Sequence, residues 1–167
     1  MTTIIVLAMH GMPPKDFPKN EKREFFRLAR QVEDEKRTDV LPRFQELDQK
    51  MRQWPRTRDN DLFHATAYEL AQAMQKKTGC EVLVGFNEFC APNMTEILDL
   101  AASKKPERVI VITPMVTRGG SHSELEIPED ISAAQKRHPT VQFSYQWPYD
   151  TEAIAQFLTD QITSVKN

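Results

Sequence analysis

Two histidines and one glutamate, His10, Glu88 and His122, are the residues of this sequence whose types could do chemistry together. Each follows a short apolar run of the kind that forms a buried strand, although more than a hundred residues separate His10 from His122. Neutral imidazole combined with carboxylate suits divalent cobalt, nickel, iron or zinc, and the same groups accept protons near neutral pH. The three residues are therefore a candidate metal-binding or acid–base site. The alternative is a set of loop residues that make ordinary hydrogen bonds.

Four apolar runs predict the strands that would position these side chains, at residues 4–8, 81–86, 109–113 and 141–145. The first three are typical of buried parallel strands. In open α/β sheets, ligands bind outside the carboxyl ends of the strands. Because His10, Glu88 and His122 each follow one of the first three runs, we expect all three at the same edge of the sheet.

Three helices are predicted between the first and second strands, because apolar residues recur there at helical intervals. In chain order these positions are Phe25, Phe26, Ala29, Val32, Phe44, Leu47, Met51, Trp54, Phe63, Ala67, Leu70 and Met74. A break near residues 38–40 separates the first two helices, and Gly79 is placed to end the third.

Further helices are predicted after the second, third and fourth strands. Asn93 and Glu96 form a capping pattern at the start of one of them. The last helix follows Asp150, and its apolar stripe consists of Ile154, Phe157, Leu158, Ile162 and Val165. This order predicts an α/β fold: an open parallel four-stranded sheet with helices on both faces, plus a helical insertion after strand one. We expect residues 1–167 to form a single domain.

The insertion, at about residues 15–60, is the most highly charged part of the chain, with 13 basic and 10 acidic residues. Mixed charge at helical spacing is typical of a solvated helix face. The alternatives are that the insertion covers the cleft, forms a subunit interface or docks a partner. The sequence does not choose among them.

Composition and missing motifs exclude several classes of protein. The formal net charge of −2 gives no support for a nucleic-acid partner. No apolar run is long enough for a signal-peptide core or a membrane span, so a cytoplasmic protein without a membrane partner is expected. The phosphate-binding patterns GxGxxG and GxxxxGK[ST] are absent, which disfavours nucleotide binding. The nucleophile pattern GxSxG is absent too.

Three motifs resemble those of one enzyme family. They are His10-Gly11 after the first strand, Gly85–Glu88 with Pro92 after the second, and Gly120–His122 followed by Glu126–Pro128 after the third. Together they are similar to the motifs of the small sirohydrochlorin cobaltochelatases, the CbiX-like class II tetrapyrrole chelatases. The chain differs from that pattern at residues 12–14, where Met-Pro-Pro replaces a polar turn, and at Glu126, where Asp is common.

The resemblance implies a fold that is one chelatase-like half, and a lyase that inserts cobalt, nickel or iron into sirohydrochlorin or a related tetrapyrrole. His10, Glu88 and His122 would bind the metal, and the histidines would take protons from the macrocycle. The divalent metal is then a co-substrate, and no organic cofactor is implied. Arg118 and Lys15 are candidates for a basic rim that meets the substrate carboxylates. A homodimer is expected, since one such half leaves one side of the macrocycle uncovered. The alternative is a carrier that binds a metal or tetrapyrrole at the same site without catalysis.

For other residues near this edge of the sheet, the sequence allows two possible roles. Glu124 and Glu126 either flank the metal's approach or stabilise the N-terminus of the next helix. Trp147 and Tyr149 either stack on a planar ligand or form part of the core. Met12, Met115 and Phe89 could provide an apolar floor for a flat ring.

Overall fold

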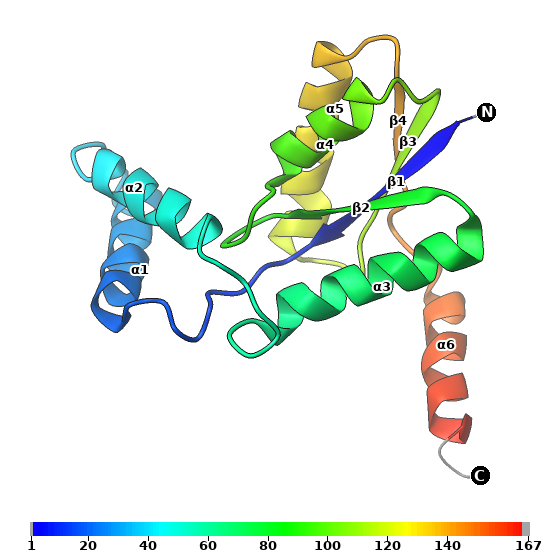
Figure 1. Cartoon of the computed structure of the whole chain (residues 1–167), viewed down its shortest axis with the longest axis horizontal. Coiled ribbons are helices and arrows are strands. Elements are labelled where there is room, and N and C mark those ends of the chain that lie inside the picture. The colour runs from blue at the N-terminus through cyan, green and yellow to red at the C-terminus, as the bar shows by residue number, and fades with distance from the viewer. Residues whose placement is uncertain (1, 165–167) are drawn as a thin grey trace.

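A computed structural model describes residues 2–164, and its centre is a sheet of four parallel strands in the order β2-β1-β3-β4 (Figure 1). The strands are β1 (Thr3–Met9), β2 (Glu81–Phe86), β3 (Arg108–Ile112) and β4 (Gln142–Tyr145). Leu7 in β1 pairs with Val84 in β2 and with Ile112 in β3, so the carboxyl ends of the three strands are aligned. The predicted open parallel sheet is confirmed.

Helices cover both faces of the sheet, as predicted. The helix α3 (Leu62–Thr78) contacts β2 on one face, while α4 (Met94–Ser103) and α5 (Ile127–Arg137) pack together against the other (Figure 1). A short π-helical segment, η1 (His122–Glu126), leads directly into α5. This arrangement leaves the carboxyl edge of the strands uncovered by α3, α4 and α5.

The insertion after β1 forms two helices, α1 (Lys19–Glu33) and α2 (Leu41–Arg52), which stand beyond the carboxyl end of β1 (Figure 1). They have their own apolar cluster, whose buried members are Phe17, Phe25, Leu28, Leu47 and Met51. Ion pairs such as Arg43 with Glu24, at 2.9 Å, join the two helices. The insertion is therefore a folded unit beside the sheet edge.

Local signals for the ends of α3 are confirmed, and one predicted position of its apolar stripe is wrong. Asp61 accepts a hydrogen bond from the backbone of His64 at the start of α3, and Gly79 ends that helix with φ +70°. Leu70, which was predicted on the buried face of α3, is exposed, and Ala71 is buried instead. A small residue there lets the helix lie close to the sheet.

The last helix, α6 (Thr151–Ser164), forms as predicted but contributes no buried residue to the core. None of its residues is buried, and Phe157, Leu158 and Ile162 are each more than half exposed. Figure 1 shows it pointing away from the sheet. Val165, the last predicted position of its stripe, lies outside the described residues. Between residues 2 and 164, no helix is long and apolar enough to cross a bilayer.

Candidate active site

The structure brings His10, Glu88 and His122 together at the carboxyl edge of the sheet. Nδ1 of His10 lies 2.5 Å from Oε1 of Glu88, and Nε2 of His122 lies 3.8 Å from the same oxygen. One potential ligand atom from each residue falls within 4.8 Å of the others. The two imidazole rings meet edge to face with their centroids 4.6 Å apart. This donor set could hold a divalent metal ion.

Backbone pairing beyond the strands places His10 beside Glu88. The backbone N–H of Asn87 donates to the carbonyl of Met9 at 2.9 Å, and that of Glu88 donates to the carbonyl of His10 at 3.1 Å. Gly11 follows with φ +128°, and a Cβ added to it would lie 1.8 Å from the carbonyl oxygen of Glu88. The glycine of the His-Gly motif is therefore required, because the two loops touch there.

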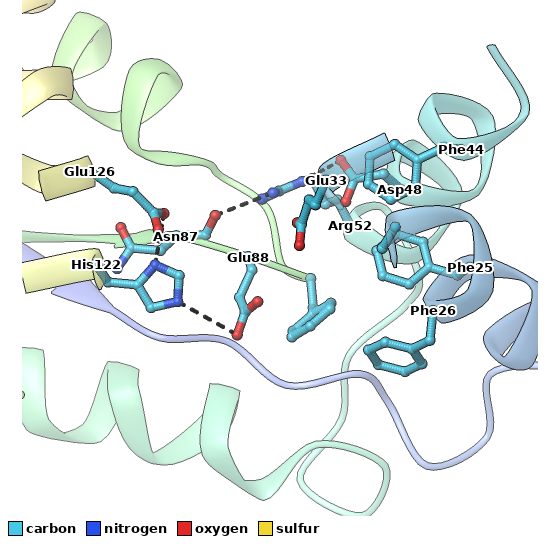
Figure 2. A pocket seen from close by; sticks show the side chains of 12 residues that line it. Phe25, Phe26, Glu33, Phe44, Asp48, Arg52, Asn87, Glu88, His122 and Glu126 are labelled. Atoms are coloured by element: carbon cyan, nitrogen blue, oxygen red, sulfur yellow. Dashed lines mark hydrogen bonds and ion pairs between the residues drawn. The ribbon is translucent and has the colours of Figure 1, made fainter. Parts of the chain in front are cut away.

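A second carboxylate orients His122, which is the first residue of η1. Nδ1 of His122 lies 2.7 Å from Oε2 of Glu126, four residues later (Figure 2). A carboxylate at Nδ1 holds the proton on that nitrogen, so Nε2, which faces Glu88, is left to bind a metal or accept a proton. Glu126 therefore acts on the site through His122.

Burial raises the pKa of the Glu88 carboxyl, and the neighbouring imidazoles of His10 and His122 oppose that rise. The contact with His10 is the shorter of the two that Oε1 of Glu88 makes with the imidazoles. The site opens toward His10, whose side chain is 49% exposed, against 29% for Glu88 and 18% for His122.

Arg52 at the end of α2 ties the insertion to the loop that carries Glu88. Its guanidinium donates to the carbonyl oxygens of Asn87 and Cys90, at 3.2 Å and 3.1 Å, and to the carboxylate of Asp48 at 2.8 Å. The residues on either side of Glu88 and Phe89 are thus held by one side chain.

Arg56 fixes the same loop from a buried position. It forms an ion pair with Asp61, donates to the carbonyl of Phe89, and donates to the carbonyl of Met12 at 2.7 Å. Arg56 therefore connects the loop after β1 with the loop after β2. Sequence reasoning missed both arginines, because nothing in their spacing distinguishes them from the other cations of the insertion.

Arg118 and Lys15 do not join the site. Arg118 is exposed and makes two hydrogen bonds to Glu124, at 2.8 Å and 3.0 Å. Lys15 is also exposed, and neither residue lines the pocket that contains Glu88 and His122. Their contact with a substrate stays a prediction.

Most of the residues proposed to contact a planar ligand have structural roles instead. The hydroxyl of Tyr149 donates to the carbonyl of Thr113, and Trp147 packs against Tyr149 with ring centroids 5.3 Å apart. Met115 packs against the core beneath the sheet, whereas Phe89 lines the pocket beside Glu88. Met12 is exposed, so of Met12, Met115, Phe89, Trp147 and Tyr149 only Phe89 lines that pocket.

The two other histidines lie outside the site. His64 in α3 stacks on Phe86, with centroids 5.2 Å apart, and His138 at the end of α5 contacts Asp99 at 2.7 Å. Neither side chain lines the pocket that contains Glu88 and His122.

Comparison with known proteins identifies relatives with tetrapyrrole chemistry. The chain is 33% identical over 82 residues to a sirohydrochlorin cobaltochelatase of Priestia megaterium, a match that covers 48% of this chain and 26% of that protein. The matched segment thus spans about a quarter of this relative's length.

Two solved structures share the fold. A putative cobalamin (vitamin B12) biosynthesis CbiX protein from Marinobacter aquaeolei VT8 aligns over 97% of this chain and 95% of its own, with a TM-score of 0.57 and 13% identity. The sirohydrochlorin chelatase SirB from Bacillus subtilis subspecies spizizenii, in complex with cobalt, aligns over 89% of this chain, with a TM-score of 0.52 and 15% identity. The alignment covers 44% of SirB, so this chain spans less than half of it.

A family model described as CbiX matches residues 57–165. The match includes Glu88 and His122, while His10 and the helices α1 and α2 precede it. Because it covers more than half of the sequence, and the chelatase-like fold agrees with it, the chain belongs to the CbiX family.

Proposed function

We propose that this chain is a chelatase that inserts a divalent metal ion, cobalt, nickel or iron, into sirohydrochlorin or a related tetrapyrrole. The observation that carries the proposal is the convergence of donor atoms from His10, Glu88 and His122 within 4.8 Å at the carboxyl edge of the sheet. The relatives support it: one is named a sirohydrochlorin cobaltochelatase, and SirB structures hold cobalt or Fe3+.

Metal insertion exchanges one divalent cation for two pyrrole protons, so the site needs bases and weakly held metal ligands in one place. His10 and His122 supply two imidazole nitrogens that can accept those protons. Glu88 contacts both imidazoles and can hold the incoming cation through its carboxylate. A half-open site with few ligands favours release of the metal into the macrocycle.

We also propose that the active form is a homodimer. The chain spans 44% of SirB, so two copies would be needed to provide a surface of similar extent. The exposed stripe of Phe157, Leu158 and Ile162 on α6 offers apolar area for such contact. Sedimentation of the wild type and of Phe157→Asp tests this, since a dimer interface on α6 predicts a concentration-dependent dimer that the variant loses.

The activity is tested by mixing anaerobic sirohydrochlorin with the purified protein and cobalt, nickel or ferrous ions, and following the macrocycle absorption bands. His122→Ala is the test variant. His138→Gln is the control, because His138 lies at the opposite end of α5 and contacts Asp99 instead. Rates above the metal-only reaction that disappear in His122→Ala and persist in His138→Gln support the chelatase.

The same experiment separates the enzyme from a carrier. If the bands shift when protein is added but no metal accelerates insertion, a tetrapyrrole-binding carrier replaces the proposal. If there is neither acceleration nor a shift, sirohydrochlorin is not the substrate.

A further inference from the structure

The outer face of α1 carries a stripe of three arginines. Arg23, Arg27 and Arg30 follow one another at spacings of four and three residues, so they lie on one side of the helix. All three are exposed, on the side away from the buried Phe25. They line a hollow of about 450 Å³ on the surface of the insertion. We call these three residues the arginine stripe.

The carboxylates of α1 do not neutralise the arginine stripe. Glu21 pairs with Lys50 at 2.6 Å and Glu24 pairs with Arg43 at 2.9 Å, both across the contact with α2. Within the described residues, 2–164, no carboxylate forms an ion pair with an arginine of the stripe. The acidic side chains thus hold the two helices of the insertion together, while the arginines face outward.

Folding alone gives no reason for this arrangement. Like charges three or four residues apart on a helix repel one another and destabilise it. The helix dipole favours cations in the last turn, which explains Arg30 but not Arg23. Arg27 gains one hydrogen bond, to the side chain of Gln31 at 3.1 Å. Anionic groups of a partner would relieve the repulsion that remains.

An exposed aromatic ring lies beside the arginine stripe. Phe26 is 45% exposed and lines the same hollow. Its ring is held edge to face by Phe25 and Phe89, with centroids 5.3 Å and 5.9 Å away. Arginine and aromatic side chains are the types enriched at the centres of protein interfaces. Together they fit a partner that presents carboxylates next to an apolar side chain.

The surroundings of the stripe disfavour two other polyanions, nucleic acid and an anionic membrane. The three arginines span only about 10 Å of helix at 1.5 Å per residue, and Glu35 lines the same hollow. Nucleic acid needs a more extended basic surface, and the formal net charge of the chain is −2. Helices that bind membranes bury their apolar face in lipid. In α1, that face packs in the insertion's own cluster through Phe25 and Leu28.

We propose that the outer face of α1 docks an acidic segment of a partner protein, with carboxylates bound by the arginine stripe and an apolar side chain against Phe26. Guanidinium groups bind carboxylates through two parallel hydrogen bonds, which orients the segment. Phe26 also lines the pocket that contains Glu88 and His122, so the docked partner lies next to the candidate active site. This position suits a protein that delivers a substrate to the site or takes a product from it.

Docking is tested by fluorescence anisotropy with two short labelled peptides rich in glutamate, one with a central phenylalanine and one with serine in its place. The triple variant Arg23→Gln, Arg27→Gln and Arg30→Gln is expected to bind the phenylalanine peptide about tenfold more weakly than the wild type. Added salt is expected to weaken binding to the wild type. Because the variant removes repulsion between like charges, its melting temperature is expected to stay the same or rise.

A second triple variant controls for net charge. Lys76→Gln, Lys77→Gln and Lys136→Gln remove the same number of positive charges from exposed positions on α3 and α5. This variant is expected to bind both peptides as the wild type does. Cobalt affinity, measured separately by calorimetry, is expected to be unchanged in both triple variants, so a failure of docking is distinguishable from a failure of the proposed function.

Phe26→Ala tests the apolar part of the contact. The variant is expected to bind the phenylalanine peptide more weakly than the wild type and the serine peptide equally well. Leu70→Ala is the control, since Leu70 is 41% exposed on α3 and does not line the hollow. Equal binding of both peptides by the wild type would overturn the role of Phe26.

The remaining outcomes each decide against the proposed partner. If the wild type binds neither peptide, or if the two triple variants lose the same affinity, the docking surface is overturned. If a single-stranded oligonucleotide of equal charge or phosphatidylglycerol vesicles bind more tightly than the peptides, nucleic acid or membrane replaces the acidic segment. If the arginine variant alters sedimentation of the protein by itself, a second copy of this chain occupies the stripe.

Discussion

The loop that carries Glu88 and the segment that carries His122 are held in place by different parts of the molecule. The Glu88 loop is held by Arg52 and Arg56, which belong to the insertion and its exit. Arg52 acts across 35 and 38 residues of sequence, which is the distance to Asn87 and Cys90.

The His122 segment is held by residues close to it in the chain and by Tyr145 of β4, whose hydroxyl donates to the carbonyl of Ser123 at 3.1 Å. Arg118 binds Glu124, the hydroxyl of Ser123 donates to the carbonyl of Gly120 at 3.2 Å, and Glu126 contacts His122. All of them lie within the range matched by the family model. The comparison indicates that the position of Glu88 depends on the insertion, whereas the position of His122 does not.

The largest expected effect is that of Arg56→Met on stability. Arg56 and Asp61 form an ion pair whose side chains are only 6% and 1% exposed, so the variant leaves a buried carboxylate without its partner. The free energy of unfolding is expected to fall by about 3–5 kcal/mol. Urea denaturation measures this. Arg58→Met is the control: its exposed pair with Glu69 is worth less than about 1 kcal/mol. A similarly small loss of unfolding free energy in both variants would contradict a stabilising role for the buried ion pair between Arg56 and Asp61.

Gly11→Ala tests the contact between the loops after β1 and β2. The new Cβ would lie 1.8 Å from the carbonyl oxygen of Glu88, so the loops must separate. We expect a loss of about 3 kcal/mol in unfolding free energy, from overpacking and from the left-handed backbone. Gly79→Ala is the control, since its φ is also positive but nothing lies within 4 Å. It is expected to cost about 1 kcal/mol. Equal losses would show that the close approach does not matter.

Arg52→Met tests whether the insertion positions Glu88. The variant removes both hydrogen bonds to the Glu88 loop but leaves His10, Glu88 and His122 in the sequence. Because groups that orient a ligand control metal affinity, cobalt affinity is expected to fall between about tenfold and a hundredfold, as measured by calorimetry. Arg43→Met, which breaks contacts within the insertion, is the control. Unchanged affinity in Arg52→Met would mean that the loop holds its shape without the insertion.

Glu126→Leu tests whether the carboxylate of Glu126 positions His122. It removes the carboxylate 2.7 Å from Nδ1 of His122, so the imidazole loses its orientation. Cobalt affinity is expected to fall about tenfold. Glu126→Gln keeps an acceptor oxygen for Nδ1 and should recover most of that affinity. A glutamine variant as weak as the leucine variant would point to the charge of Glu126 rather than its hydrogen bond.

Topology explains why the sequence predicts that His10, Glu88 and His122 lie together. The apolar runs before His10, Glu88 and His122 are short and β-branched, which identifies parallel strands. The carboxyl ends of parallel strands meet at one edge, so residues more than a hundred positions apart could be placed together. The glycine of the His-Gly motif also has a structural reason, because the loop that carries Glu88 comes close to the backbone of Gly11.

The parts that could not be predicted depend on how separate elements approach one another. The contacts of Arg52 and Arg56 go to backbone carbonyls, which have no residue-type signature in a sequence. The stripe of α6 predicted an amphipathic helix correctly, but such a pattern does not say what the helix packs against. The pocket beside Phe26 has the same origin, since it exists only because α1 and α2 stand beside the Glu88 loop.

The smallest expected effect is a pH dependence of stability from His64, which supports the end of β2 by stacking on Phe86. Burial lowers the pKa of His64, so the unfolded chain binds a proton more readily than the folded one. The stabilisation is therefore complete above the pKa of the unfolded state, about 6.5, and is lost as the pH falls below it. His64→Phe keeps an aromatic ring but cannot be protonated. Melting temperatures at pH 7.5 and 5.5 should differ less in this variant than in the wild type, and equal differences would exclude His64 as the cause. Acid would therefore weaken the packing at the end of β2, next to the loop that carries Glu88.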